Sequence, residues 1–221
     1  MRKKKEIRNW ILIGESGCGK TELSLFLAKK KRKETGKTVH LIDMDQTKGM
    51  FRSRDFAEEM AKDGIEIISG AHFMDMPVVP HGVERLLSDE AVVNIMDVGG
   101  NEIGAVSLGQ FSAFVNAAEA KVLYIINPYR NFSGTAENIK LLMEGIQNAG
   151  RVERISVICN PNVGEGTTAE DILNGYAALK ERLQPLRLSA EALVLPDWVK
   201  EESVSQLSIP KWIITPYIKY P

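Results

Sequence analysis

Hydrophobic positions along the chain form short apolar runs that alternate with segments of helical period. The runs consist of aliphatic and β-branched residues without regular polar alternation, which is typical of strands covered on both faces of a parallel sheet. We therefore predict strands at residues 7–13, 38–43, 65–69, 91–97, 121–127, 155–159 and 192–195.

Between these runs, Ile139, Leu142, Met143 and Ile146 recur at the i, i+3, i+4, i+7 spacing of an amphipathic helix. Similar stripes predict helices around residues 23–27, 111–118 and 172–183. Strands that alternate with helices are typical of crossover units. The pattern predicts an α/β fold, with a mostly parallel central sheet flanked by helices.

Length and charge narrow the picture further. The 221 residues fit one domain, 1–221, and the net charge of -1 provides no broad field for DNA or anionic lipid. No apolar stretch reaches the ~18 residues of a membrane span. The tail, residues 212–221, carries Pro216 and β-forming residues, so it is not expected to form an amphipathic membrane-anchoring helix. We expect a cytoplasmic protein whose partners are neither DNA nor membrane.

The two cysteines, Cys18 and Cys159, form no C-x-x-C pair. A disulfide framework, a zinc site and an iron-sulfur cluster within one chain are therefore all disfavoured.

A glycine-rich segment follows the first predicted strand and matches G-x-x-x-x-G-K-[ST], the phosphate-binding loop. Glycines let such a loop curl so that successive N–H groups face one phosphate, beside the positive end of the following helix. The lysine is expected to reach the β- and γ-phosphates, and the threonine to bind Mg²⁺. The residues are Gly14, Glu15, Ser16, Gly17, Cys18, Gly19, Lys20 and Thr21.

Carboxylates follow two other predicted strands. Asp97 ends the run 92–97 and precedes Gly99 and Gly100, so it is a candidate for the Mg²⁺ side, with turn formation as the alternative. Asp43 and Asp45 follow the second strand at alternate positions, where one of them would orient the attacking water. A capped turn is the alternative reading of this pair.

The order of these motifs resembles that of the MinD/ParA-like ATPases, relatives of the nitrogenase iron protein. The glycine loop, Asp45, Asp97 and the later pairs 159–160 and 196–197 carry the resemblance, which spans most of the chain. The resemblance implies ATP and Mg²⁺ as ligands, Asp45 as the water-orienting carboxylate, and Thr21, Asp97 and Asp45 as the metal side.

The resemblance also implies that Asn160, Pro196 and Asp197 lie beside adenine. Asn160 is alternatively a turn residue before Pro161. Guanine-specific relatives commonly carry Asn-Lys-x-Asp late in the domain, whereas residues 160–163 read Asn-Pro-Asn-Val. The sequence therefore favours ATP over GTP.

One loop position departs from the family. Glu15 stands where many members carry a lysine that crosses a dimer interface to the partner's nucleotide. The trans-acting lysine therefore does not transfer to this chain, and a nucleotide-dependent homodimer stays an open question. The cluster cysteines of the iron protein are missing as well.

Residues 51–55 read Phe-Arg-Ser-Arg-Asp. Arg52 and Arg54 suit either an anionic substrate or partner, or a solvated helix start.

Together these features predict an ATPase that hydrolyses ATP with Mg²⁺ as a molecular switch and acts on an unidentified partner protein, with Lys20 and Asp45 as the catalytic residues. The alternative is a phosphotransferase or ATP-dependent ligase, in which Arg52 and Arg54 hold an anionic metabolite. A DNA-partitioning module ranks third, because the composition offers no broad basic face.

Overall fold

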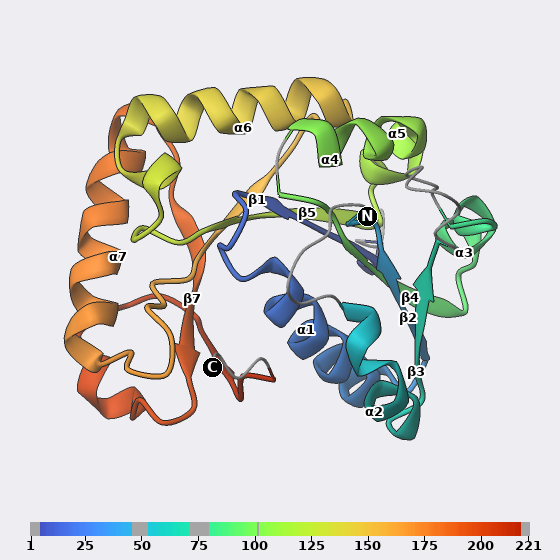
Figure 1. The fold of residues 1–221 in the computed structure, drawn as a ribbon, viewed down its shortest axis with the longest axis horizontal. Helices are drawn as coiled ribbons and strands as arrows, with labels where there is room; N and C mark the ends of the chain where they lie inside the picture. The colour runs from blue at the N-terminus through green and yellow to red at the C-terminus, as the bar shows by residue number, and fades with distance from the viewer. Residues whose placement is uncertain (1–4, 46–52, 71–79, 101, 218–221) are drawn as a thin grey trace.

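The computed structural model describes residues 5–45, 53–70, 80–100 and 102–217. Its centre is an 8-stranded sheet in the order β3-β2-β4-β1-β5-β6-β7-β8, and every neighbouring pair is parallel (Figure 1). This confirms the predicted fold class. The strands are β1 (Asn9–Gly14), β2 (Thr38–Asp43), β3 (Ile65–Ser69), β4 (Val92–Asp97), β5 (Ala120–Ile126), β6 (Ser156–Cys159), β7 (Ala190–Pro196) and β8 (Lys211–Ile214).

Seven of these strands were predicted, and β8 was missed as a strand. It covers only 4 residues and pairs with β7 through Val194 and Trp212. Pro210 and Pro216 flank it, and such a short run between prolines gives little periodic signal. The strand confirms that its part of the tail is not a helix.

The helices differ in length. The longer ones are α1 (Lys20–Thr35), α6 (Ala136–Gly150) and α7 (Ala169–Leu183). Short helices and 3₁₀ turns fill the connections: η1 (Ser53–Phe56), α2 (Ala57–Lys62), α3 (Val83–Ser88), α4 (Glu102–Val106), η2 (Ser107–Phe111), α5 (Ser112–Val115), η3 (Asn131–Ser133), η4 (Gln184–Leu186) and η5 (Glu201–Val204).

The single helix expected over 111–118 was wrong. A 3₁₀ turn ends at Phe111 and α5 covers only 112–115. The backbone N–H of Ala117 donates to the carbonyl of Phe114, and β5 starts at Ala120, so the chain has no room for another helical turn.

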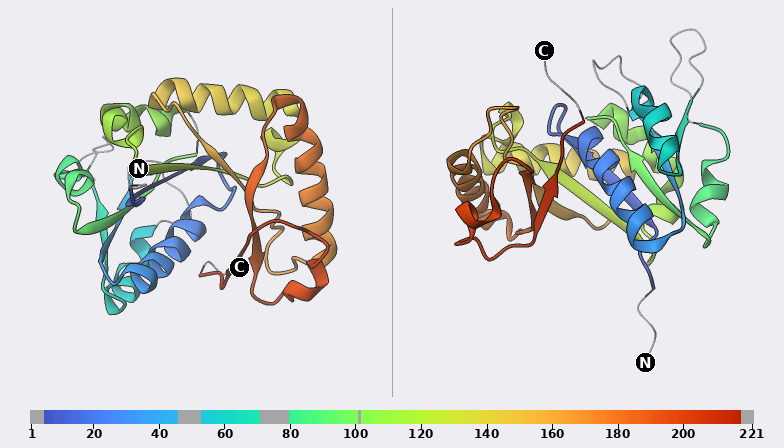
Figure 2. Two further views of the ribbon diagram at one scale, coloured as in Figure 1. Left: turned by 180° about the vertical axis from the view of Figure 1, so that it is seen from behind. Right: turned by 90° about the horizontal axis from the view of Figure 1, so that it is seen from below.

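Side chains of β1 alternate between two hydrophobic cores. Ile11 and Ile13 face the layer that contains α6 and α7, whereas Leu12 faces α1 and α2. Figure 1 shows α4, α5 and α6 on one side of the sheet and α1 with α2 on the other. In Figure 2, seen from behind, α7 stands beside β7 at the far end. Both faces are therefore covered, as the unbroken apolar runs predicted.

Parallel pairing brings the carboxyl ends of the strands to one edge. Asp43 at the end of β2 lies in register with Asp97 at the end of β4, and Leu12 of β1 is also opposite Asp97. The loops that carry the candidate residues therefore start from one edge of the sheet. Within the described parts of the chain, no helix is long and apolar enough to cross a bilayer.

Candidate functional site

The loop between β1 and α1 depends on glycine at three positions. Gly14, Gly17 and Gly19 have φ angles of 143°, 73° and 96°. A Cβ at Gly14 would lie 2.3 Å from the carbonyl oxygen of Ile125, and one at Gly19 would lie 2.4 Å from Nδ2 of Asn160. Both backbone conformation and close packing therefore exclude other residues there. The loop therefore has the curled backbone that a phosphate cradle requires, and its binding of phosphate remains a prediction.

Lys20 lies inside this loop. Lys20 is only 7% exposed, and its Nζ donates to the carbonyls of Gly14 at 3.1 Å and Glu15 at 2.8 Å. The ammonium group therefore concentrates positive charge within the cradle, beside the N-terminus of α1.

The Glu15 side chain is buried against η3. One carboxylate oxygen accepts a hydrogen bond from the backbone N–H of Phe132 at 3.1 Å, and the other accepts from Oγ of Ser133 at 3.1 Å. These donors satisfy the carboxylate and hold its charge on the side of η3.

Asp97 brings a carboxylate next to Thr21. Thr21 lies close enough to this carboxylate to lower its pKa, and Oγ of Ser53 donates to it at 3.3 Å. Burial raises the pKa of Asp97 to about 7, the neighbouring Asp43 adds to the rise, and Lys20 opposes it. A loop hydroxyl close to a buried carboxylate fits a hard divalent cation, which favours oxygen ligands.

Asp43 and Asp45 form the second acidic element. Asp43 is buried, and Nε of Arg54 pairs with it at 2.9 Å. Burial raises the pKa of Asp43, and the Arg54 guanidinium opposes that rise. The backbone N–H of Asp45 donates to Oδ1 of Asp43 at 3.0 Å. The Oδ1 of Asp45 lies 3.3 Å from the point where a Cβ on Gly99 would sit. Asp45 therefore lies against the turn that follows Asp97.

Arg54 pairs inside the fold with Asp43, and its Nη2 also donates to the carbonyl of Asp45 at 3.3 Å. This contact, not a solvated helix start, accounts for the residue. Arg52 and Phe51 lie outside the described residues.

The glycine pair after Asp97 approaches the loop closely. A Cβ on Gly100 would lie 2.6 Å from the Cα of Ser16. Only glycine permits this contact, which joins the turn after β4 to the phosphate cradle.

Asn160 braces the cradle from β6. It is 4% exposed, and Nδ2 donates to the carbonyl of Cys18 at 2.8 Å. Among the described residues, its Oδ1 has no hydrogen-bond partner. The side chain is therefore a loop-holding group, and its predicted contact with adenine remains a prediction.

A cavity of about 330 Å³ opens beside the cradle. It is lined by Gly17 and Gly19 from the loop, Asn127 and Arg130 after β5, and further residues: Glu22, Asn160, Asn162, Val163, Gly164, Glu165 and Pro216. Its position and its mixed polar lining suit the nucleoside part of a ligand whose phosphates bind the loop. Sequence reasoning missed Asn127 and Arg130, although Asn127 follows its strand just as Asn160 follows β6.

Pro196 ends β7 and Asp197 follows it, and neither is among the residues that line this cavity. Asp197 accepts a hydrogen bond from Oγ1 of Thr215 at 2.6 Å. Pro216, which follows β8, lines the cavity instead. The placement of Pro196 and Asp197 beside adenine therefore stays a prediction.

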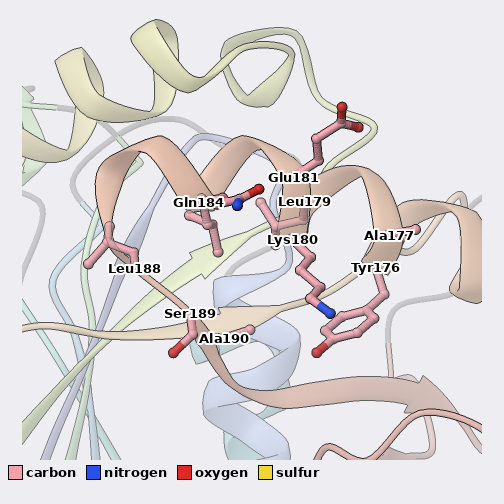
Figure 3. A pocket seen from close by; sticks show the side chains of 10 residues that line it. Tyr176, Ala177, Leu179, Lys180, Glu181, Gln184, Leu188, Ser189 and Ala190 are labelled. Carbon is pink, nitrogen blue, oxygen red and sulfur yellow. The ribbon is translucent and has the colours of Figure 1, made fainter.

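A second cavity, of about 580 Å³, lies between α7 and the start of β7. Figure 3 shows Tyr176 and Lys180 reaching from α7 towards Ser189 and Ala190. This cavity lies at the amino end of β7, whereas the phosphate loop follows the carboxyl end of β1.

In the described parts of the chain, no three or more His, Cys, Asp or Glu residues cluster as a metal site. Mg²⁺ needs no such cluster, because it is commonly held by one or two protein oxygens together with substrate phosphates and water. Thr21 and Asp97 carry oxygen atoms of the kind that such a site would use.

No protein-family model and no curated protein matches the sequence. Solved structures match the fold. The signal recognition particle receptor FtsY from Elizabethkingia anophelis, in complex with GDP, has a TM-score of 0.54 and 16% identity, over 87% of this chain and 58% of that chain. FtsY from Thermotoga maritima has a TM-score of 0.55 and 17% identity, over 91% of this chain and 66% of that chain.

FlhF complexed with GTP and Mg²⁺ has a TM-score of 0.50 and 13% identity, over 78% of this chain and 62% of that chain. The chain thus spans less than two thirds of the length of these proteins. The likeness confirms the predicted P-loop fold, although the matched structures are FtsY and FlhF proteins and not the MinD/ParA group that the motif order suggested. The chain has the α/β fold of the P-loop NTPases.

Proposed function

We propose that the chain binds a nucleoside triphosphate with Mg²⁺ at the loop Gly14–Thr21 and hydrolyses it, as a switch read by a partner protein. The observation that carries this proposal is the approach of Thr21, in the loop, to the buried carboxylate of Asp97, whose pKa Thr21 lowers. It joins the phosphate loop to the acidic strand end, which is where a triphosphate and its metal are held together in P-loop NTPases.

The chain's own groups divide the work. Loop N–H groups and Lys20 bind and orient the phosphates, while Thr21 and Asp97 would hold the metal. Bound Mg²⁺ supplies positive charge that offsets the charge developing on the phosphates. Asp45, half-buried against Gly99, would accept a hydrogen bond from the attacking water and so fix its direction.

The turn after Asp97 leads to an element that can report occupancy of the site. The turn after Asp97 touches Ser16 through Gly100 and then enters α4. There, Ile103 is 78% exposed and Val106 is 63% exposed. A shift of that turn would move an apolar surface, which is the kind of change that a partner protein reads.

The base is the finer part of the proposal. We propose ATP, because Val163 stands where guanine-specific relatives carry a carboxylate. GTP is the competing candidate, because the matched FtsY and FlhF structures hold GDP and GTP and because Glu165 gives this cavity a carboxylate of its own. Isothermal titration of the two nucleotides against one protein sample separates them: tighter binding of GTP would overturn the choice of ATP.

The hydrolysis itself is tested by phosphate release from ATP and from GTP, with Mg²⁺ and without any acceptor. The switch predicts slow release that Lys20→Ala abolishes. Strict dependence on an added metabolite would instead favour a phosphotransferase or ligase. That alternative has lost one of its supporting residues, since Arg54 is paired with Asp43.

A further inference from the structure

The segment after β5 is tied to the phosphate loop at two points. Phe132 and Ser133 donate to the Glu15 carboxylate, each at 3.1 Å. Two residues earlier, Nε of Arg130 donates to the carbonyl of Gly17 at 3.0 Å. Glu15 and Gly17 belong to the phosphate loop itself, so the segment 128–134 is a second wall of the cradle.

This wall is also held from behind. Nη1 of Arg182, on α7, donates to the carbonyls of Pro128 at 2.9 Å and Ser133 at 2.8 Å. Contacts on both sides fix the backbone around Arg130 before any ligand binds, which lowers the entropy that its side chain would lose on binding.

Arg130 itself faces the cradle. Its Cζ lies 3.6 Å from the point where a Cβ on Gly17 would sit, and it lines the same cavity as Gly17, Gly19 and Asn160. A guanidinium carries five N–H donors, and the bond from Nε to Gly17 uses one of them. The planar fork matches phosphate oxygens better than any other cationic side chain does.

We infer that Arg130 binds the phosphate chain of the nucleotide within the same subunit, and that Glu15 is the residue that positions it. The inference rests on the proposed nucleotide site. Glu15 holds η3 against the loop, and Arg130, which directly precedes η3, is thereby placed beside the loop.

The location of Arg130 predicts which phosphates it contacts. It lies on the cavity side with Gly17 and Gly19, whereas Asp45 and Asp97 lie on the metal side. Arg130 therefore contacts phosphates that the diphosphate retains, and it stabilises bound di- and triphosphate alike. Removing it should weaken binding of the di- and triphosphate by a similar factor, because a contact that both ligands make does not distinguish between them.

Isothermal titration with ATP and ADP, or with GTP and GDP if wild type prefers guanine, tests this. Arg130→Ala should weaken both nucleotides roughly 10- to 100-fold, the range expected for hydrogen bonds to a charged group, and Arg130→Lys should fall between. Arg154→Ala is the matched control, since Nη2 of this exposed arginine also donates to one carbonyl, that of Asn116 at 2.9 Å. It should bind like wild type.

A double-mutant cycle tests the positioning role. Glu15→Ala should weaken both nucleotides in the wild-type background but should add little once Arg130 is alanine, because its effect passes through that side chain. Additive losses would show that Glu15 acts independently and would overturn its role. If Glu15→Ala does not fold, Glu15→Gln keeps an acceptor for Ser133 and enters the same cycle.

Two results would reject the role of Arg130: affinity of Arg130→Ala within twofold of wild type, or a loss confined to turnover. Failure of the nucleotide site itself looks different, because wild-type protein would then bind neither nucleotide and Lys20→Ala would change nothing.

Discussion

Replacing Asn160 separates two roles for this residue: bracing the phosphate loop or reading the base. Its Nδ2 donates to the buried carbonyl of Cys18 at 2.8 Å, while its own Oδ1 lacks a partner in the described structure. Asn160→Ala leaves the Cys18 carbonyl unsatisfied, at a cost of ~1–3 kcal/mol. Removing the unpartnered Oδ1 recovers part of that, so we expect a net loss of ~1–2 kcal/mol.

For a chain of this length, such a loss lowers the Tm by about 2–8 °C. If the nucleotide must then reorder the loop, affinity falls roughly 5- to 30-fold, and equally for ATP and GTP. Asn160→Asp is the matched variant, because it keeps the shape of the side chain but replaces the amide donor with an acceptor; it should bind at least as weakly as the alanine variant.

Thermal unfolding and isothermal titration of both nucleotides measure these quantities. A changed ratio of ATP to GTP affinity with an unchanged Tm would refute the bracing role and place Asn160 at the base.

Three further predictions follow from named contacts. Because the pKa of Asp97 is raised from 3.8 to about 7, protons compete with Mg²⁺, so the affinity for Mg²⁺ should fall about tenfold per pH unit below 7, and Asp97→Asn should remove this dependence. The raised pKa also means that Mg²⁺-free protein should lose stability as pH rises from 3.8 to about 7, because the folded state holds the proton more tightly than the unfolded state. Gly100→Ala should weaken nucleotide binding at least ~10-fold without unfolding the chain, because its Cβ would lie 2.6 Å from the Cα of Ser16; Gly166→Ala, where a Cβ meets open space, is the control in titration and circular dichroism. Arg54→Ala should cost about 3 kcal/mol in urea unfolding at pH 8, and adding Asp43→Asn should restore most of it, since no buried charge then lacks a partner; no rescue would contradict the pairing.

Local patterns were enough to predict most of the fold. Unbroken apolar runs mark strands buried on both faces, and the i, i+3, i+4, i+7 stripe of Ile139 and Ile146 marks α6, where both residues are buried. Short elements escaped, because β8 is too brief for a period to show and the segment 111–118 must turn into β5.

The candidate site was likewise predictable where its signals are local in the sequence, and not where they depend on contacts between distant residues. The glycine loop and Asp97 were visible because their signals are local: fixed spacing after a strand, and a carboxylate at a strand end. The contacts of Glu15 with Ser133 and of Asn160 with Cys18 join residues 118 and 142 positions apart. No local pattern encodes such pairs, since they exist only after parallel strands bring their carboxyl ends together.

The central claim, that the loop Gly14–Thr21 binds a nucleoside triphosphate with Mg²⁺, is tested most directly by titrating ATP and GTP into wild-type protein and Lys20→Ala, with Mg²⁺ or with EDTA. We predict that wild type binds at least one nucleotide, that EDTA weakens this binding, and that Lys20→Ala abolishes it while the far-ultraviolet circular dichroism spectrum stays unchanged. Equal nucleotide affinity in wild type and a folded Lys20→Ala variant, or no binding by wild type, would contradict the claim.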